Sequence, residues 1–279
     1  MKSLASAIAA IPLIGTSAFA ADMALKAAPA PVAQVYNWTG FYVGLNAGGV
    51  FGGNSNVALP SVDFGPTPSG FAAAQSIGAY PTSLNVKQTG FIGGGQIGYN
   101  WQFNQFVTGF ETDIQGASAK GSSTASLFNP APPAINFSAP VGGTATVSRR
   151  LDYLGTVRGR LGFAADNVLF YVTGGLAYGE TKLSYAGTIG FPSAPTVVLA
   201  AANSTSKTSV GGTIGGGIEY SFGHNWSAKV EYLYFDLGHQ TTTIGGAFTN
   251  FNAGGTGGFS TASVRNDGNI VRGGLNYRF

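Results

Sequence analysis

The stretch from Arg149 to Phe163 is the most regular part of the sequence, because two kinds of side chain alternate along it. Leu151 and Val157 fall on one parity with other apolar or small residues, whereas Arg158 and Arg160 fall on the other. Successive side chains of a strand point to opposite faces, so a period of two predicts a β-strand. One face of this strand is apolar and the other is charged, so the two faces must meet very different surroundings.

The same alternation recurs in seven further segments, at residues 41–51, 88–102, 106–115, 168–178, 209–222, 226–234 and 270–279. We therefore predict eight strands. Short turns around 103–105, 165–167 and 223–225 join three pairs of them as tight hairpins. The other connections are long and low in complexity, at 53–86, 119–148, 182–206 and 238–264. This plan predicts an all-β fold, an eight-stranded antiparallel up-and-down transmembrane β-barrel with three short periplasmic turns and four long, mobile extracellular loops.

Composition separates a membrane barrel from a soluble one. Only 9% of the residues are charged, whereas about 25% is typical of soluble domains. Aromatic residues make up 13% of the chain, and many of them fall at the predicted periplasmic strand ends, as in an interfacial girdle. The net charge of +3 is spread along the chain, so a nucleic-acid partner is not expected. The absence of Cys excludes disulfides and thiolate chemistry.

The first residues of the chain predict a signal for export. Lys2, the apolar stretch from Leu4 to Ile14 and the sequence Ala18-Phe19-Ala20 are typical of a signal peptide. We expect a signal peptide over residues 1–20, an Ala/Pro-rich linker over 21–36 and the barrel over 37–279, located in the bacterial outer membrane.

Five blocks of sequence resemble a known family. They are WTGFYVGLNAG at 38–48, LDYLGTVRGRLGFA at 151–164, GGGIEYSF at 215–222, KVEYLYFDLG at 229–238 and the terminal GGLNYRF. In this order they resemble the small outer-membrane β-barrel proteins of alphaproteobacteria, a porin-type family that includes opacity-type surface antigens and haemin-binding proteins. The resemblance extends from the signal peptide to Phe279 and implies a barrel similar to the membrane domain of OmpA.

The polar parity predicts a set of charges inside the barrel. It comprises five acids and five bases, namely Glu111, Asp113, Asp152, Glu219 and Glu231 with Arg150, Arg158, Arg160, Lys229 and Arg272. Eight strands leave an interior just wide enough for side chains to fill, so these charges must pair or shift their pKa. The balanced count favours a structural, charge-paired lumen. A narrow porin-like passage for small ions is the alternative.

Two further residue sets belong to the strand ends. Five cations fall at the predicted extracellular ends on the lipid-facing parity, namely Lys87, Lys120, Arg149, Lys182 and Arg265. They predict either a rim that contacts lipopolysaccharide or ordinary interfacial snorkelling. At the other end, Leu275, Tyr277 and Phe279 resemble the C-terminal signal read by the barrel assembly machinery. Self-association is left open.

Enzyme and cofactor chemistry find little support. The resemblance to haemin-binding proteins suggests His239, Tyr80 and Tyr185 as candidate haem ligands, but we expect no cofactor. A lipid hydrolase that uses His239 with Thr241 is the weakest alternative, because neither His in the chain sits in a plausible triad. The sequence therefore favours a structural surface protein that is not an enzyme.

Overall fold

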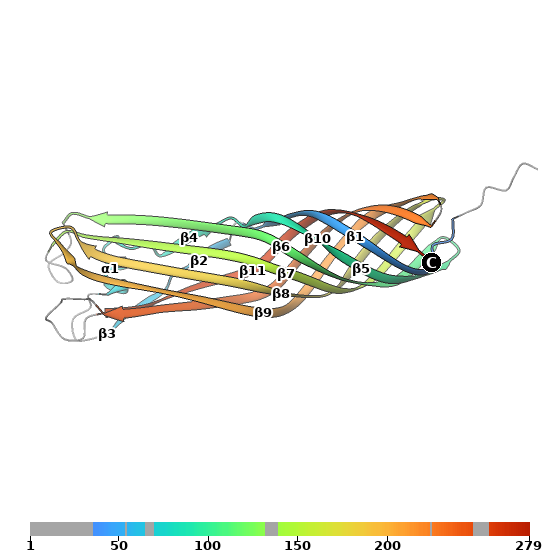
Figure 1. Ribbon diagram of the computed structural model, residues 1–279. Helices are drawn as coiled ribbons and strands as arrows, with labels where there is room; N and C mark the ends of the chain where they lie inside the picture. The colour runs from blue at the N-terminus through green and yellow to red at the C-terminus, as the bar shows by residue number, and fades with distance from the viewer. Residues whose placement is uncertain (1–35, 54, 65–69, 132–138, 224, 248–256) are drawn as a thin grey trace, which may run out of the picture. The chain divides into compact units, whose positions relative to one another are not determined.

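The computed structural model describes residues 36–53, 55–64, 70–131, 139–223, 225–247 and 257–279. The expected signal peptide and the expected linker up to residue 35 lie outside these residues. Within them, long antiparallel strands follow one another around a ring, and β1 closes the ring by pairing with both β5 and β11. The ring strands are β1 (Gly40–Gly52), β5 (Thr89–Phe103), β6 (Phe106–Asn129), β7 (Val141–Ala165), β8 (Val168–Phe191), β9 (Ala194–Gly223), β10 (Trp226–Ala247) and β11 (Gly257–Arg278). The predicted antiparallel barrel is confirmed (Figure 1).

Tight turns connect the strands at the end of the barrel where the C-terminus lies (Figure 1). Asn104, Asp166 and Asn225 adopt positive φ angles of 55°, 49° and 68° in these turns. Short hairpin loops require a left-handed backbone, and Asn and Asp tolerate it better than most residues. The three turns therefore lie where the sequence predicts them.

The strands extend far beyond the predicted segments. β7 has 25 residues and β9 has 30, whereas about 9–11 residues suffice to cross a membrane. The expectation of long, low-complexity loops at 119–148 and 182–206 is wrong for most of their length, because these residues form the outer halves of β6 to β9. Small apolar residues such as Ala145, Val147 and Leu183 point inward there, while Ser and Thr point outward.

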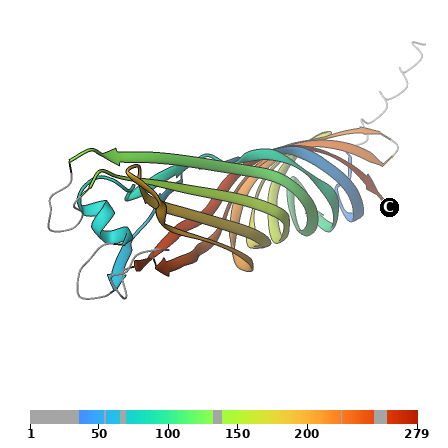
Figure 2. The same cartoon turned by 60° about the vertical axis from the view of Figure 1, so that its left-hand side comes forward.

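A folded segment between β1 and β5 occupies the end of the barrel opposite to the tight turns. It contains β2 (Ser55–Ala58), β3 (Ser61–Phe64), α1 (Phe71–Ser76) and β4 (Ser83–Val86), and Figure 2 shows α1 among the long strands at this end. β3 pairs with β11, and β2 pairs with β4 and β11. We call residues 55–64 and 70–86 the plug segment.

The plug segment is fixed by its own polar contacts and by an apolar core. The Asp63 carboxylate accepts hydrogen bonds from the backbone N–H groups of Gly70, Ala72 and Ala73 at 3.0, 2.8 and 2.7 Å. Negative charge at the start of a helix satisfies free N–H groups and opposes the helix dipole. Phe71 is fully buried and belongs to an apolar cluster that includes side chains of β7, β8, β9, β10 and β11. The first connection is therefore a plug rather than a mobile loop.

The outer surface is apolar at the turn end. Exposed aromatic side chains surround that end, namely Phe41, Trp101, Phe106, Phe163, Phe170, Tyr220, Phe222, Trp226 and Phe279. Further along the strands the outward residues are aliphatic, such as Ile114, Val157 and Leu176. This order agrees with an aromatic girdle below a lipid-facing belt. No helix within the described residues is long and apolar enough to span a bilayer.

Candidate functional site

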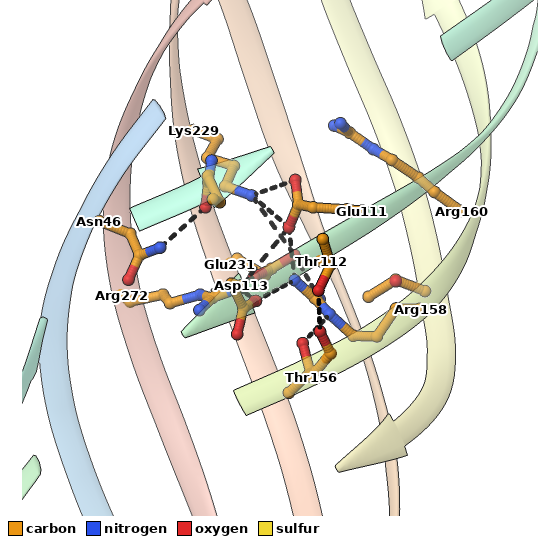
Figure 3. A network of polar contacts seen from close by, with 12 residues as sticks. Asn46, Glu111, Thr112, Asp113, Thr156, Arg158, Arg160, Lys229, Glu231 and Arg272 are labelled. Atoms are coloured by element: carbon orange, nitrogen blue, oxygen red, sulfur yellow. Dashed lines mark hydrogen bonds and ion pairs between the residues drawn. The ribbon is translucent and has the colours of Figure 1, made fainter. Parts of the chain in front are cut away.

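A network of ion pairs crosses the lumen at the level of the apolar belt (Figure 3). The Arg158 guanidinium contacts Asp113 Oδ2 at 2.9 Å and Glu231 Oε1 at 3.0 Å, and it also pairs with Glu111. The Lys229 ammonium donates to both oxygens of Glu111, at 2.9 and 2.8 Å. All of these side chains are almost completely buried. The network therefore holds its charges away from water and in mutual contact.

The network continues to the remaining strands. Arg272 Nε donates to Glu231 Oε2 at 2.7 Å, and its Nη2 lies 2.9 Å from Asp113 Oδ2. Arg160 pairs with Glu219 and stacks over the Tyr171 ring at 3.7 Å. Four acids and four bases are thus paired, as expected for buried charges that cannot be hydrated.

The strand order explains why these contacts close the lumen. Glu111 lies on β6 and Lys229 on β10, which face each other across the ring. Arg158 on β7 reaches Glu231 on β10, so a second bridge runs beside the first. Side chains that join opposite walls fill the interior of a small barrel.

Polar side chains that the sequence did not single out complete the network. Tyr42 donates to Glu111 Oε2 at 2.8 Å, and Asn276 Nδ2 donates to Glu219 Oε1 at 2.8 Å. Gly98 leaves room for the Tyr42 phenol, because a Cβ atom there would lie 2.4 Å from its oxygen. A Tyr or Asn on the charged parity was the available signal, since such a position points into the lumen wherever the strand is regular.

Apolar layers lie above and below the network. Towards the tight turns, Trp38, Val107 and Leu169 form one buried cluster. Towards the plug segment, a second cluster includes Leu154 and Phe235, and the plug core follows it. The described lumen is therefore filled at several successive levels.

The structure reverses the expected roles of two neighbouring arginines. Arg149, expected at the lipid-facing rim, is buried and donates to the Arg265 carbonyl at 2.9 Å and to Asn266 Oδ1 at 3.1 Å. Arg150 and Asp152, expected in the lumen, form an ion pair on the outer surface. The register of β7 against β8 shifts between Leu151 and Tyr153. A bulge inverts the parity of every residue beyond it, so Leu151 also points inward.

The remaining expected rim cations lie on the outer surface. Lys87, Lys120 and Lys182 are exposed on one part of the wall, and Arg265 is exposed on β11, where it pairs with Asp236. Lys207 keeps the inward parity that the sequence predicts, because it is directly opposite the buried Thr181 on β8, but its side chain is exposed. These cations do not form an even ring.

The candidate haem ligands are not brought together. The Tyr80 and Tyr185 hydroxyls lie 2.9 Å apart in the buried plug core, whereas His239 is exposed on β10 opposite Arg265. Burial raises the pKa of Tyr80 above its usual range, which disfavours a phenolate ligand. His239 was expected to begin a loop but lies within β10, and Thr241 is exposed on the same strand. No three His, Cys, Asp or Glu side chains of the described residues gather in a metal-binding cluster.

The C-terminal residues end the last ring strand. Leu275 pairs with Leu45 on β1 and with Ala228 on β10. Tyr277 stacks against Trp226 and Phe279, with ring centroids 5.1 and 5.2 Å away. The side chains expected to signal assembly thus also close the ring.

Comparisons with known proteins agree with this architecture. A family model described as outer membrane protein beta-barrel domain matches residues 17–279. The 31 kDa outer-membrane immunogenic protein of Brucella melitensis biotype 1 is 36% identical over 245 residues, which cover 86% of this chain and 89% of that protein. The 25 kDa outer-membrane immunogenic protein of Brucella abortus biovar 1 is 26% identical over 285 residues, covering 100% and 99%. Among solved structures, OprG from Pseudomonas aeruginosa aligns with a TM-score of 0.40 and 11% identity, over 87% of this chain and 97% of that one.

Proposed function

Because this chain belongs to the outer membrane β-barrel protein family, we propose that it is a structural surface protein of the cell envelope whose barrel does not conduct. The observation that carries this proposal is the ion-pair network, which joins opposite walls of the lumen through Arg158, Lys229 and Glu111. The protein would hold a long extracellular β-structure above the membrane rather than form a passage through it.

The plug segment, at the end of the barrel opposite to the tight turns, also supports a barrel that does not conduct. Phe71 and Tyr80 fill the extracellular half of the barrel and pack against Tyr185 and Ile189 of β8. An ion would have to cross this apolar core before it reached the network. Desolvating an ion in such surroundings is very costly. The narrow porin-like passage is therefore the weaker alternative.

Haemin binding and lipid hydrolysis have less support. Tyr80 and Tyr185 already bond to each other in a buried core, and His239 lies on the outer wall. These positions do not bring the three residues together to bind haem, and they do not support a catalytic triad. We therefore retain the structural role alone, with no enzyme activity and no cofactor.

Single-channel recording in a planar bilayer tests the proposal. We expect the folded, full-length protein to give no conductance steps, because the lumen is closed at successive levels. An open porin in the same bilayer shows that channels are detected. Reproducible steps that scale with the amount of folded protein would contradict a non-conducting barrel.

A further inference from the structure

The outer wall of β6 to β8 carries a row of cations that the register brings together. Lys120 on β6 is directly opposite Arg150 on β7, and Arg150 is directly opposite Lys182 on β8. The outward residue of β9 opposite Lys182 is Ser206, so the row ends at β8. Lys87 follows β4, and its backbone carbonyl lies against Gly121, the residue after Lys120. We call the four exposed residues Lys87, Lys120, Arg150 and Lys182 the cation row.

The cation row has too little negative charge of its own. Like charges that are directly opposite on neighbouring strands destabilise a sheet. Asp152 pairs with Arg150, and Glu180 lies on the same outer face two residues before Lys182. Two acids therefore face four bases. An external anion would remove the repulsion between Lys120, Arg150 and Lys182.

The surroundings of the row indicate which anion fits. On the side of the tight turns, the outward residues are aliphatic, as at Ile114, Val157 and Leu176. On the other side, a row of serines crosses β6, β7, β8 and β9, with Ser122 opposite Ser148, Ser148 opposite Ser184 and Ser184 opposite Ser204. Outward hydroxyl pairs continue beyond it, such as Thr124 with Thr146 at 3.0 Å.

We propose that the cation row is a binding site for the phosphate groups of lipopolysaccharide. The wall presents apolar side chains, then cations, then hydroxyls, in the order in which lipopolysaccharide presents acyl chains, phosphates and sugars. A phospholipid has the first two parts but no sugar layer for the serine row. Lys and Arg bind phosphate through charge-assisted hydrogen bonds, and hydroxyls suit saccharides because they both donate and accept.

The site is one-sided. Across the ring, β10 and β11 present Asp236 and Asp267 with Arg265, and Arg265 is already paired with Asp236. That wall has more acid than base. The predicted rim of five cations around the barrel is therefore replaced by a phosphate site whose cations lie on β6 to β8 and at Lys87. This inference uses the membrane location of the barrel and is independent of whether the lumen conducts.

Binding of purified lipopolysaccharide to the detergent-solubilised protein tests the site. The triple variant Lys87→Gln, Lys120→Gln and Lys182→Gln should bind on the order of 100-fold more weakly, at about fivefold per cation near an anionic surface. Lys182→Gln alone should weaken binding about fivefold. Arg265→Gln removes an exposed cation from the opposite wall and should leave binding unchanged. Heat-modifiable migration on a gel verifies that each variant is folded.

Three probes establish the ligand. Dephosphorylated lipopolysaccharide should bind to the wild type about as weakly as intact lipopolysaccharide binds to the triple variant. Phosphatidylglycerol vesicles and inorganic phosphate should bind more weakly than lipopolysaccharide. Unchanged binding by the triple variant, or unchanged binding after dephosphorylation, would overturn the site. Equal binding of phosphatidylglycerol would overturn its assignment to lipopolysaccharide. The conductance result bears on the proposed function and not on this site.

Discussion

Arg158 contacts three carboxylates that come from two other strands, so one side chain holds together a large part of the lumen. Its Nε also donates to Thr156 at 2.9 Å. Removal of one partner from a buried ionic network leaves charges that water cannot reach. Glu111, Asp113 and Glu231 would then share fewer cations.

We predict that Arg158→Leu lowers the free energy of unfolding by about 3–5 kcal/mol. Urea unfolding in lipid vesicles measures the change. Arg150→Leu is the matched control, because Arg150 lies on the same strand but forms an exposed pair with Asp152. Exposed pairs contribute about 0–1 kcal/mol. Equal losses in the two variants would refute a structural role for the buried network.

At the residue scale, most of the charged side chains that the sequence assigns to the lumen are buried. Arg158, Arg160 and their partners are in the interior, because parity along a regular strand decides which way a side chain points. Arg149 and Arg150 could not be assigned in this way. The bulge near Asp152 inverts the parity, and no special residue type marks its position in the sequence.

Among the elements, α1 depends on a single carboxylate. The Asp63 carboxylate accepts hydrogen bonds from three backbone N–H groups at the start of this short helix. Gln75 Nε2 adds hydrogen bonds to the carbonyls of Leu59 and Pro81, at 2.6 and 2.9 Å. The plug segment therefore relies on local polar contacts as well as on its apolar core.

We predict that Asp63→Ala destabilises α1 locally by about 1–2 kcal/mol, as for loss of a helix cap. Amide hydrogen exchange over residues 70–76, followed by mass spectrometry, should become about 5–30-fold faster. Asp152→Ala removes an acidic side chain from the outer wall and serves as the control. Unchanged exchange at 70–76 in the Asp63 variant would show that packing alone holds the helix.

The lengths of the ring strands could not be predicted from the alternation. In the outer halves of β6 to β9, many outward residues are Ser and Thr, and several inward ones are small, as at Ala145 and Val147. Alternation of hydroxyl with small apolar residues is a weaker signal than alternation of lipid-facing aromatics with charges. The plug segment could not be predicted because its core comes from strands far away in the sequence.

For the whole molecule, the last residue is both a girdle side chain and the end of the closing strand. The Phe279 ring lies 5.8 Å from the Phe41 ring, and its N–H donates to the Phe41 carbonyl. We predict that deletion of Phe279 lowers the fraction of chains assembled into the outer membrane. The heat-modifiable species on a gel measures that fraction. Phe128→Ala, which removes an exposed aromatic from the far end of β6, should leave it unchanged.

If migration is unaffected by the deletion, Phe279 is only a girdle residue. A lower assembled fraction with normal unfolding energy in the chains that do fold would instead support recognition of the C-terminal strand.

β11 pairs with β2 and β3 as well as with β1 and β10. The plug segment can therefore complete its folding only after the last strand is in place. Residues 55–64 are synthesised early, yet their strand partners at 257–263 come almost last. Until β11 docks, Val57 and Leu59 lack the cover that Ala262 and Val264 provide in the finished barrel. We expect a stalled or truncated chain to remain bound to periplasmic chaperones and to be degraded, so that only chains with an intact last strand reach the surface.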